Sequence, residues 1–481
     1  MKRISGVLFF LFLWAGFLHA QTLLTNELNK LISSDPLLKT SEVGIVVHDL
    51  TAGKELYSYQ ADKLYRPASI EKVVTAVTAL DVLGKDFQFQ TTLSYDGVVE
   101  KGILKGNLYV KGGFDPEFME LDMDFLVRAV KEAGIQAISG KLVGDVSLMD
   151  SIYWGEGWSW DDTPEAFQPY LSPLMLNRGC VDIKVSPAAK GKAGTVEITP
   201  ESDYYQLNNR SISLHPEAGK LKITRDWLTN GNTIDVSGCV SSVRKRTLNL
   251  YDSKRFFMDT FCYKLNKEGL SVSKDSIFFL TAPDSTQWIY TCRRPVEEVL
   301  KRALKESDNL SAEALFRQLG QMNGKHTSHI SFGDCQVVIG RFMRNAIGHD
   351  PKEYRIVDGS GVSLYNYVSP RLILAYLNYA YRHPSVFQTF YDCLPVAGVD
   401  GTLQGRMRTG KAFRNVRAKT GTVTGISSLA GYLTSVNGHK ISFVIINQNV
   451  LKARQARKLQ DKICELLIQL NWVKKSAETY F

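Results

Sequence analysis

Cysteine and histidine are scarce in this chain, which has seven cysteines and eight histidines among 481 residues. No two cysteines form a C-x-x-C pair, and no H-E-x-x-H segment occurs. Those spacings are typical of zinc sites, so we expect no metal centre. Seven cysteines are also too few for a disulfide-rich scaffold. Because seven is odd, at least one thiol stays free or pairs with another chain, and the sequence leaves the pairing open.

Runs of basic residues are also missing. Lys and Arg outnumber Asp and Glu by 58 to 49, which gives a net charge of +9 that is not concentrated in any segment. Nucleic-acid-binding proteins usually show a clustered basic stripe, often with aromatic residues between the charges. We therefore expect no nucleic-acid partner. A mild basic excess suits an anionic wall or membrane surface, but it is also ordinary for a solvated surface. The oligomeric state is left open.

A long apolar run occurs at the N-terminus, where two basic residues precede the segment from Val7 to Leu18. The run is shorter than the roughly 20 residues that a membrane-spanning helix needs. A basic start, a short apolar run and a small residue before a polar one are typical of a cleavable signal peptide. We expect residues 1–20 to be that peptide, with cleavage near Ala20-Gln21 and export to the periplasm or cell wall.

The remaining chain is too long for one hydrophobic core, so two or three domains are expected. Residues 21–85 and 288–481 carry hairpin patterns and amphipathic helices, including an Asn-Gly turn between two apolar runs near the end. Residues 86–287 read instead as short alternating strands separated by Gly, Asn and Asp turns. We predict an α/β (α+β) protein whose two ends form one domain, with a large, mainly β insertion of one or two small domains.

The segment Ser69-Ile70-Glu71-Lys72 precedes apolar residues at helical spacing. A serine hydroxyl is a weak nucleophile until a base takes its proton, and a lysine one helical turn away can do so if its pKa is lowered. Residues three apart share a helix face. The same spacing recurs at 242–245 and 271–274, but in strand-like or turn-like sequence. By itself the motif fits a helix cap with a solvated lysine equally well.

Two further polar segments complete an ordered set. Ser307-Asp308-Asn309 lies between two helical patterns, where a hydroxyl and a carboxamide can project into a cleft, although a capping turn has the same composition. Lys419-Thr420-Gly421 leads into a strand, where lysine and threonine can bind a carboxylate and glycine lets a substrate backbone approach. Similar triplets at 408–410 and 435–437 lack the right flanks.

The three motifs occur in the order and secondary-structure contexts found in class A β-lactamases and penicillin-binding proteins. With them, the chain resembles the class C low-molecular-mass penicillin-binding proteins, which are D-alanyl-D-alanine carboxypeptidases and endopeptidases. The gap of about 230 residues between Lys72 and Ser307 is the most telling feature. Two positions depart from the pattern: Phe114 replaces an expected glycine, and Leu364 an expected arginine. Other segments that carry the resemblance are Gly112-Gly113-Phe114-Asp115-Pro116, Gly144-Asp145, Gly157-Trp158-Ser159-Trp160-Asp161-Asp162, Asp358-Gly359-Ser360-Gly361 and Asp400-Gly401-Thr402-Leu403.

The resemblance implies a serine β-lactamase/transpeptidase-like domain, with a mixed sheet covered by helices plus a helical subdomain, into which the β region is inserted. It implies that Ser69 attacks the carbonyl between two D-alanines, that Lys72 accepts its proton and that Ser307 relays a proton to the leaving amine. Peptidoglycan stem peptides would be the substrates, β-lactam antibiotics the covalent inhibitors, and no cofactor would be needed. The implied substrate-binding residues are Asn309, Lys419, Thr420, Gly421, Thr422, Asp145 and Val423.

Among these residues the resemblance distinguishes several contacts. Lys419 with Thr420 would bind the terminal carboxylate, and Asn309 would fix the peptide amide. The backbone N–H groups of Ser69 and Thr422 would hold the developing oxyanion. Two alternatives stay open on sequence alone: a serine β-lactamase, which nitrocefin turnover would reveal, and a non-catalytic penicillin-recognising wall-binding module, which labelling by a fluorescent penicillin would test.

Overall fold

The computed structural model describes residues 22–215, 217, 219–325 and 328–469. The expected signal peptide, residues 1–20, lies outside the described residues. The chain divides into two compact units. The first unit comprises Met1–Lys85, Leu300–Asp308 and Gln336–Phe481, and the second unit comprises Asp86–Val299 and Asn309–Cys335. Two ends of the chain therefore share one unit. No helix among the described residues is both long and apolar enough to cross a membrane.

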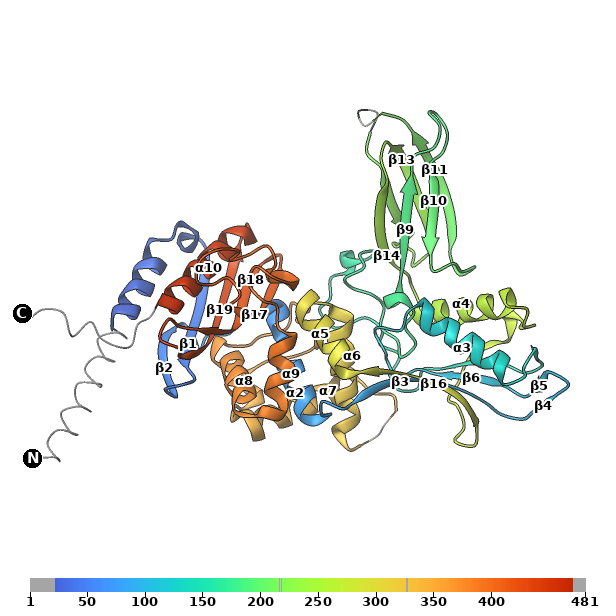
Figure 1. The fold of residues 1–481 in the computed structure, drawn as a ribbon, viewed down its shortest axis with the longest axis horizontal. Helices are drawn as coiled ribbons and strands as arrows, with labels where there is room; N and C mark the ends of the chain where they lie inside the picture. The colour runs from blue at the N-terminus through green and yellow to red at the C-terminus, as the bar shows by residue number, and fades with distance from the viewer. Residues whose placement is uncertain (1–21, 216, 218, 326–327, 470–481) are drawn as a thin grey trace, which may run out of the picture. The chain divides into compact units, whose positions relative to one another are not determined.

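The first unit is built on a five-stranded sheet in the order β17-β18-β19-β1-β2, in which every neighbouring pair is antiparallel. Blue β1 lies beside red β19 in Figure 1, so the expected N-terminal hairpin pairs with the expected C-terminal hairpin. Runs of β-branched and aromatic residues, such as Ile441 to Ile446, favour these strands. The strand bounds are β1 Glu42–Asp49, β2 Lys54–Tyr59, β17 Arg417–Val423, β18 Gly425–Thr434 and β19 Lys440–Val450.

Helices cover this sheet and provide its hydrophobic core. Leu28 in the helix 22–34 and Ile463 in α10 belong to the same buried cluster as sheet residues Ile45 and Leu429. Helix α8 contacts β1, β18 and β19, and α2 and α9 pack against α8. Gly44 of β1 faces Pro370 of α8, whereas Ile45 faces the cluster that contains α10, so helices cover both faces of the sheet and bury its apolar side chains. The helix bounds are α2 Lys72–Val82, α8 Pro370–Arg382, α9 Pro384–Cys393 and α10 Ala453–Gln469.

The second unit contains a five-stranded sheet in the order β15-β8-β6-β3-β16 and three small three-stranded sheets, β10-β9-β14, β11-β13-β12 and β4-β5-β7. Figure 1 shows helices α3 and α4 beside the five-stranded sheet, and their buried side chains share one cluster with it. The bounds are β3 Gln88–Tyr95, β4 Val98–Glu100, β5 Ile103–Lys105, β6 Leu108–Lys111, α3 Glu120–Glu132, β7 Ala137–Ile138, β8 Leu142–Asp145, β9 Cys180–Ser186, β10 Thr195–Thr199, β11 Gln206–Ser213, β12 Lys222–Arg225, β13 Thr233–Val240, β14 Arg244–Asn249, α4 Ser253–Lys267, β15 Ile277–Phe279, β16 Gln287–Pro295 and α6 Asn309–Gly320.

The second unit differs from the expected insertion in two respects. Strand β16 pairs with β3 and extends the unit to Val299, and residues 309–335 join it through helix α6. The insertion is also less purely β than the pattern suggested, because α3 and α4 are long helices. Two helices run across the unit boundaries: α5 (Val296–Lys301), continued by a π-helical turn η7 (Arg302–Glu306), and α7 (Phe332–Phe342), continued by η9 (Met343–Ile347).

Candidate active site

Ser69 lies in a 3-10 turn, η2 (Ala68–Glu71), directly before helix α2. The preceding Ala68 has a φ of 50°, in the left-handed region that a residue with a Cβ rarely adopts, so the chain turns sharply at this point. Lys72 Nζ donates to Ser69 Oγ over 3.0 Å. Ser69 keeps 8% of its surface exposed, whereas Lys72 is fully buried. A serine with limited access therefore has a potential base within hydrogen-bonding reach.

The segment Asp358-Gly359-Ser360-Gly361 holds this turn. Ser360 O accepts a 2.8 Å hydrogen bond from Lys72 Nζ, and the Asp358 carboxylate accepts from the backbone N of Gly361 over 2.9 Å. Gly361 has a φ of 80°, and a Cβ there would collide with the backbone O of Ala68. A glycine is therefore required for the two turns to touch. Ser360 acts through its backbone, which no side-chain pattern reveals.

Ser307 and Lys419 meet in the same unit. Lys419 Nζ donates to Ser307 Oγ over 2.7 Å and to Thr420 O over 2.7 Å. Ser307 ends the π-helical turn η7 with a φ of 62°, a left-handed conformation that costs about 1–3 kcal/mol for a residue with a side chain. Lys419 is fully buried, and this burial, together with the neighbouring charge of Lys72, lowers the pKa of Lys419 well below its ordinary value. Two serines and two lysines thus form one polar cluster.

Strand β17 comes unusually close to the nucleophile. A Cβ on Gly421 would lie 2.9 Å from Pro67 O and 3.0 Å from the backbone N of Ser69, so only a glycine fits. Ser428 Oγ on the neighbouring strand β18 donates to Pro67 O over 2.7 Å and fastens the same turn. The N–H of Ser69 and the backbone around Thr422 therefore lie next to each other, as a two-donor oxyanion hole requires.

A row of polar groups follows the accessible face of β17. Thr420 and Thr422 point to the same face because side chains alternate along a strand. Thr420 Oγ1 donates to Thr402 Oγ1 over 2.7 Å, and Arg457 Nη2 of helix α10 donates to Thr422 Oγ1 over 3.2 Å. Hydroxyls flanked by a guanidinium suit a carboxylate ligand. Thr402 belongs to the Asp400–Leu403 segment that carried the family resemblance, whereas Arg457 gave no sequence signal and only the fold reveals it.

The Thr402 loop is itself anchored next to Ser307. Asp400 accepts from Lys305 Nζ over 2.6 Å through one oxygen and from the backbone N of Val396 over 2.8 Å through the other. Gly401 has a φ of 54°, and a Cβ there would collide with Lys305 O. The Asp-Gly-Thr-Leu segment therefore joins the helix that carries Ser307 to the strand that carries Thr420.

Asn309 begins helix α6 and belongs to the second unit. Its carboxamide Nδ2 donates to Phe167 O over 2.9 Å and to Gln168 Oε1 over 3.3 Å. Asn309 retains 7% of its surface, while Gln168 is fully buried. Sequence patterns gave no signal for Gln168, because it lies in an irregular segment about 140 residues before Asn309.

Asp145 ends strand β8 in the second unit and is fully buried. Its two carboxylate oxygens accept from the backbone N of Ser147 and of Ala282, each over 2.9 Å. These contacts give the side chain a structural role, and the substrate contact that the resemblance implied stays a prediction. Val423, the last residue of β17, is half-buried and pairs with Ile426. Its contact with a stem peptide likewise stays a prediction.

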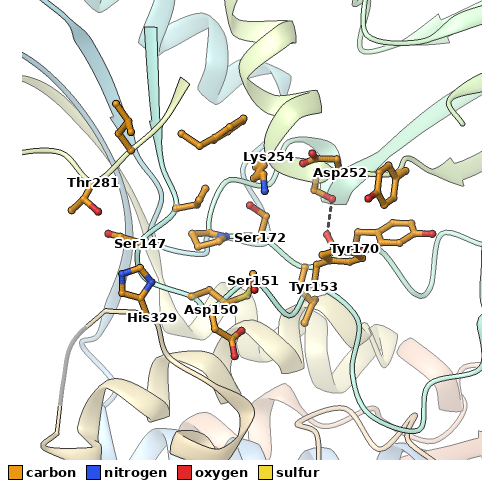
Figure 2. A pocket seen from close by; sticks show the side chains of 18 residues that line it. Ser147, Asp150, Ser151, Tyr153, Tyr170, Ser172, Asp252, Lys254, Thr281 and His329 are labelled. Carbon is orange, nitrogen blue, oxygen red and sulfur yellow. Dashed lines mark hydrogen bonds between the residues drawn. The ribbon is translucent and has the colours of Figure 1, made fainter. Parts of the chain in front are cut away.

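The second unit also contains a pocket of about 310 Å³. Figure 2 shows Lys254 and His329 on different walls of this pocket, and a hydrogen bond from Ser253 Oγ to Tyr170 O of 2.6 Å closes one side. None of the residues predicted to act in the reaction lines it. This pocket therefore contains none of the groups predicted to react.

Comparison with known proteins identifies the family. Residues 24–470 match the profile of the D-Ala-D-Ala carboxypeptidase 3 (S13) family. The chain belongs to this family. It is 30% identical over 434 residues to a D-alanyl-D-alanine carboxypeptidase of an Actinomadura species, covering 86% of this chain and 79% of the relative. It is 27% identical over 414 residues to D-alanyl-D-alanine carboxypeptidase DacB of Haemophilus influenzae, covering 84% and 85%.

The fold is also known from a solved structure. Penicillin-binding protein 4 of Haemophilus influenzae superposes with a TM-score of 0.80 at 24% identity, covering 92% of this chain and 99% of that one. The likeness confirms the predicted transpeptidase-like architecture with its insertion. Family membership makes the chain a serine peptidase, a hydrolase, and confirms the resemblance to class C low-molecular-mass penicillin-binding proteins. The carboxypeptidase/endopeptidase function is thereby favoured over a β-lactamase or a non-catalytic module.

Proposed function

We propose that this peptidase is exported and cleaves the D-alanyl-D-alanine end of peptidoglycan stem peptides through an acyl-enzyme on Ser69. The observation that carries the proposal is the 3.0 Å contact between Lys72 Nζ and Ser69 Oγ, with the second pair, Lys419 and Ser307, in the same unit. A buried amine in contact with a serine hydroxyl is the arrangement that nucleophilic catalysis requires.

Acylation starts when neutral Lys72 takes the Ser69 proton and Ser69 Oγ bonds to the carbonyl carbon between the two D-alanines. The backbone N–H groups of Ser69 and Thr422 stabilise the resulting oxyanion. When the tetrahedral intermediate collapses, the C–N bond breaks and the leaving amine needs a proton. Lys72 returns that proton through Ser307. Water then hydrolyses the ester, with the same groups acting in reverse order, and frees Ser69.

Substrate orientation follows from the polar row on β17. A terminal carboxylate beside Thr420 and Thr422 would accept their hydroxyl hydrogens, and the buried amine of Lys419, which contacts Thr420 O, lies next to them. Asn309 would fix the peptide amide. No step in this scheme needs a cofactor. A β-lactam would enter as a substrate analogue, and the Haemophilus influenzae relative has been solved in complex with one.

The test is incubation with purified muropeptides and identification of the products by mass. Release of free D-alanine from pentapeptide stems would demonstrate carboxypeptidase activity, and conversion of cross-linked dimers to monomers would demonstrate endopeptidase activity. Both should vanish in the Ser69→Ala variant. A folded wild-type protein that yields neither product, and that no penicillin acylates, would contradict the proposal.

Export is tested separately. We propose that the signal peptide is removed and that the mature protein is periplasmic or associated with the wall. The basic start and short apolar run at the N-terminus support this. N-terminal sequencing of the protein from a cell-envelope fraction should begin near Gln21. Recovery of the full-length chain from the cytoplasmic fraction alone would refute it.

A further inference from the structure

The second unit contains a buried polar network centred on Arg225, the last residue of β12, which is only 2% exposed. Arg225 Nε donates to Asn249 O over 2.7 Å, and Nη2 donates to Asn249 Oδ1 and to Thr163 Oγ1, each over 2.9 Å. Nη1 donates to Gly231 O over 2.8 Å. Burial of an arginine is unfavourable unless its donors are paired, and this one is held by backbone and amide oxygens rather than by an acid.

Asn249 connects this network to the irregular segment from Pro164 to Gln168. Asn249 is fully buried, and its Nδ2 donates to Gln168 O over 2.8 Å and to Glu165 O over 3.2 Å. The backbone N of Asn249 also donates to Pro164 O over 3.1 Å. The irregular segment from Pro164 to Gln168 is therefore fastened at three of its carbonyl groups, although it has no regular hydrogen-bonding ladder of its own.

The segment from Pro164 to Gln168 contacts Asn309, the asparagine of the Ser307-Asp308-Asn309 motif. Both hydrogens of Asn309 Nδ2 are directed at this segment, one to Phe167 O and one to Gln168 Oε1. Two acceptors define the plane of the Asn309 carboxamide, and so they also define where its oxygen lies. Reversing the Gln168 amide would bring two N–H donors together, so the contact with Asn309 fixes the orientation of Gln168 as well.

Gln168 keeps this orientation at a cost. Its Nε2 is buried and has no hydrogen-bond partner among the described residues. A buried donor without a partner is destabilising, and an apolar side chain of the same shape would avoid the cost. The Gln168 side chain thus satisfies Asn309 with its oxygen and leaves its own nitrogen unsatisfied, which indicates that the oxygen serves a purpose other than stability.

We propose that Gln168 is a positioning residue for the reaction: it holds the Asn309 carboxamide in the orientation that binds the substrate amide, and the Arg225–Asn249 network holds Gln168. The inserted region thereby contributes to catalysis through a motif residue. The inference rests on the proposed function, in which Asn309 contacts the substrate.

The experiment replaces Gln168 by methionine, which has nearly the same volume and no amide. Gln168→Met removes the acceptor for Asn309 and also the unpaired donor, so thermal stability should stay the same or rise. The rate of Ser69 acylation by a labelled penicillin should fall roughly tenfold, equivalent to about 1.4 kcal/mol. Gln168→Leu is the second variant, in case the methionine variant does not fold.

Gln318 on helix α6 provides the matched control. It is 2% exposed and its Nε2 donates to Gly113 O over 2.6 Å, so Gln318→Met breaks a satisfied buried hydrogen bond far along the same helix. This variant should lose stability and keep its acylation rate. The opposite responses of the two variants separate a positioning role from a purely structural one.

A double-mutant cycle with Asn309→Ala completes the test. If Gln168 acts through Asn309, Gln168→Met causes no additional loss of acylation rate in the Asn309→Ala background. Independent, additive losses, or wild-type acylation by folded Gln168→Met and Gln168→Leu, would overturn the inference. Wild-type protein that is not acylated at all would instead overturn the proposed function, so the two failures are distinguishable.

Discussion

Replacing Lys72 by arginine tests the proposed base directly. Lys72 Nζ contacts Ser69 Oγ at 3.0 Å and Ser360 O at 2.8 Å, and the side chain is fully buried. To accept the serine proton, Lys72 must be neutral, whereas an ordinary lysine, with a pKa of about 10.4, is almost wholly protonated at neutral pH. Arginine can keep the positive charge and the contacts, but its guanidinium does not give up a proton in proteins.

The expected loss of acylation rate follows from the proposed role of Lys72 as the general base. General-base assistance by a positioned side chain contributes about 10²–10⁴-fold to a rate, which corresponds to roughly 3–5 kcal/mol of activation free energy. Penicillin acylation of Lys72→Arg should fall by that factor. The larger guanidinium also has to fit a filled site, and overpacking costs about 1–3 kcal/mol of stability. Lys72→Met introduces a side chain smaller than arginine that also cannot accept the proton. Its acylation rate should fall by the same factor without the overpacking cost.

The pH dependence of acylation provides a second test of Lys72 as the base. Burial and the charge of Lys72 lower the pKa of Lys419, so the cluster does not favour two ammonium groups at once. Because only neutral Lys72 can accept the serine proton, acylation by the wild-type enzyme should rise with pH and then level off. The assay is pseudo-first-order labelling by a fluorescent penicillin, with intact-mass detection and thermal melts as a folding check. Near wild-type acylation of Lys72→Arg, or a flat pH profile, would refute Lys72 as the base.

Three further predictions address the nucleophile, the substrate and the stability of the second unit. Ser69→Ala should abolish both D-alanine release and penicillin labelling, and peptide mapping of the wild-type adduct should find one site; an adduct on Ser242 or Ser271 would contradict the assignment. Amidation of the substrate C-terminus should slow turnover by roughly one to two decades, because a charge-assisted hydrogen bond contributes about 1.5–3 kcal/mol; equal cleavage of acid and amide would exclude the proposed role of Thr420 and Lys419. Burial raises the pKa of Asp115 to about 7, despite the opposing charge of Arg294. Because the folded state then binds the proton more tightly than the unfolded state, the free energy of unfolding falls as pH rises from about 4 to about 7. Asp115→Asn should therefore raise the melting temperature more at pH 8 than at pH 5. An equal shift at both pH values would argue against the raised pKa.

Parts of the site could be predicted because their geometry is local. Ser69 and Lys72 are three residues apart, and a helical pattern follows them, so their contact depends only on the pitch of one turn. The hairpins of the first unit have apolar runs separated by turn residues, and the structure contains them at the expected places. The helices of the insertion were harder to see. Met123, Leu126, Val127 and Val130 have helical spacing, but strand and turn patterns on both sides mask it.

Other parts depend on contacts that no local pattern encodes. The carbonyl of Ser360 binds Lys72 across 288 residues, and every residue type carries such a carbonyl. Thr402 meets Thr420 only because Asp400 and Lys305 fix a loop next to Ser307. The sequence alone thus determined the chemical groups, their order and the two hairpins, since these follow from residue type and short-range periodicity. The tertiary structure decided which carbonyls, hydroxyls and amides surround them, because those partners come from distant segments that only the packing within each unit brings together.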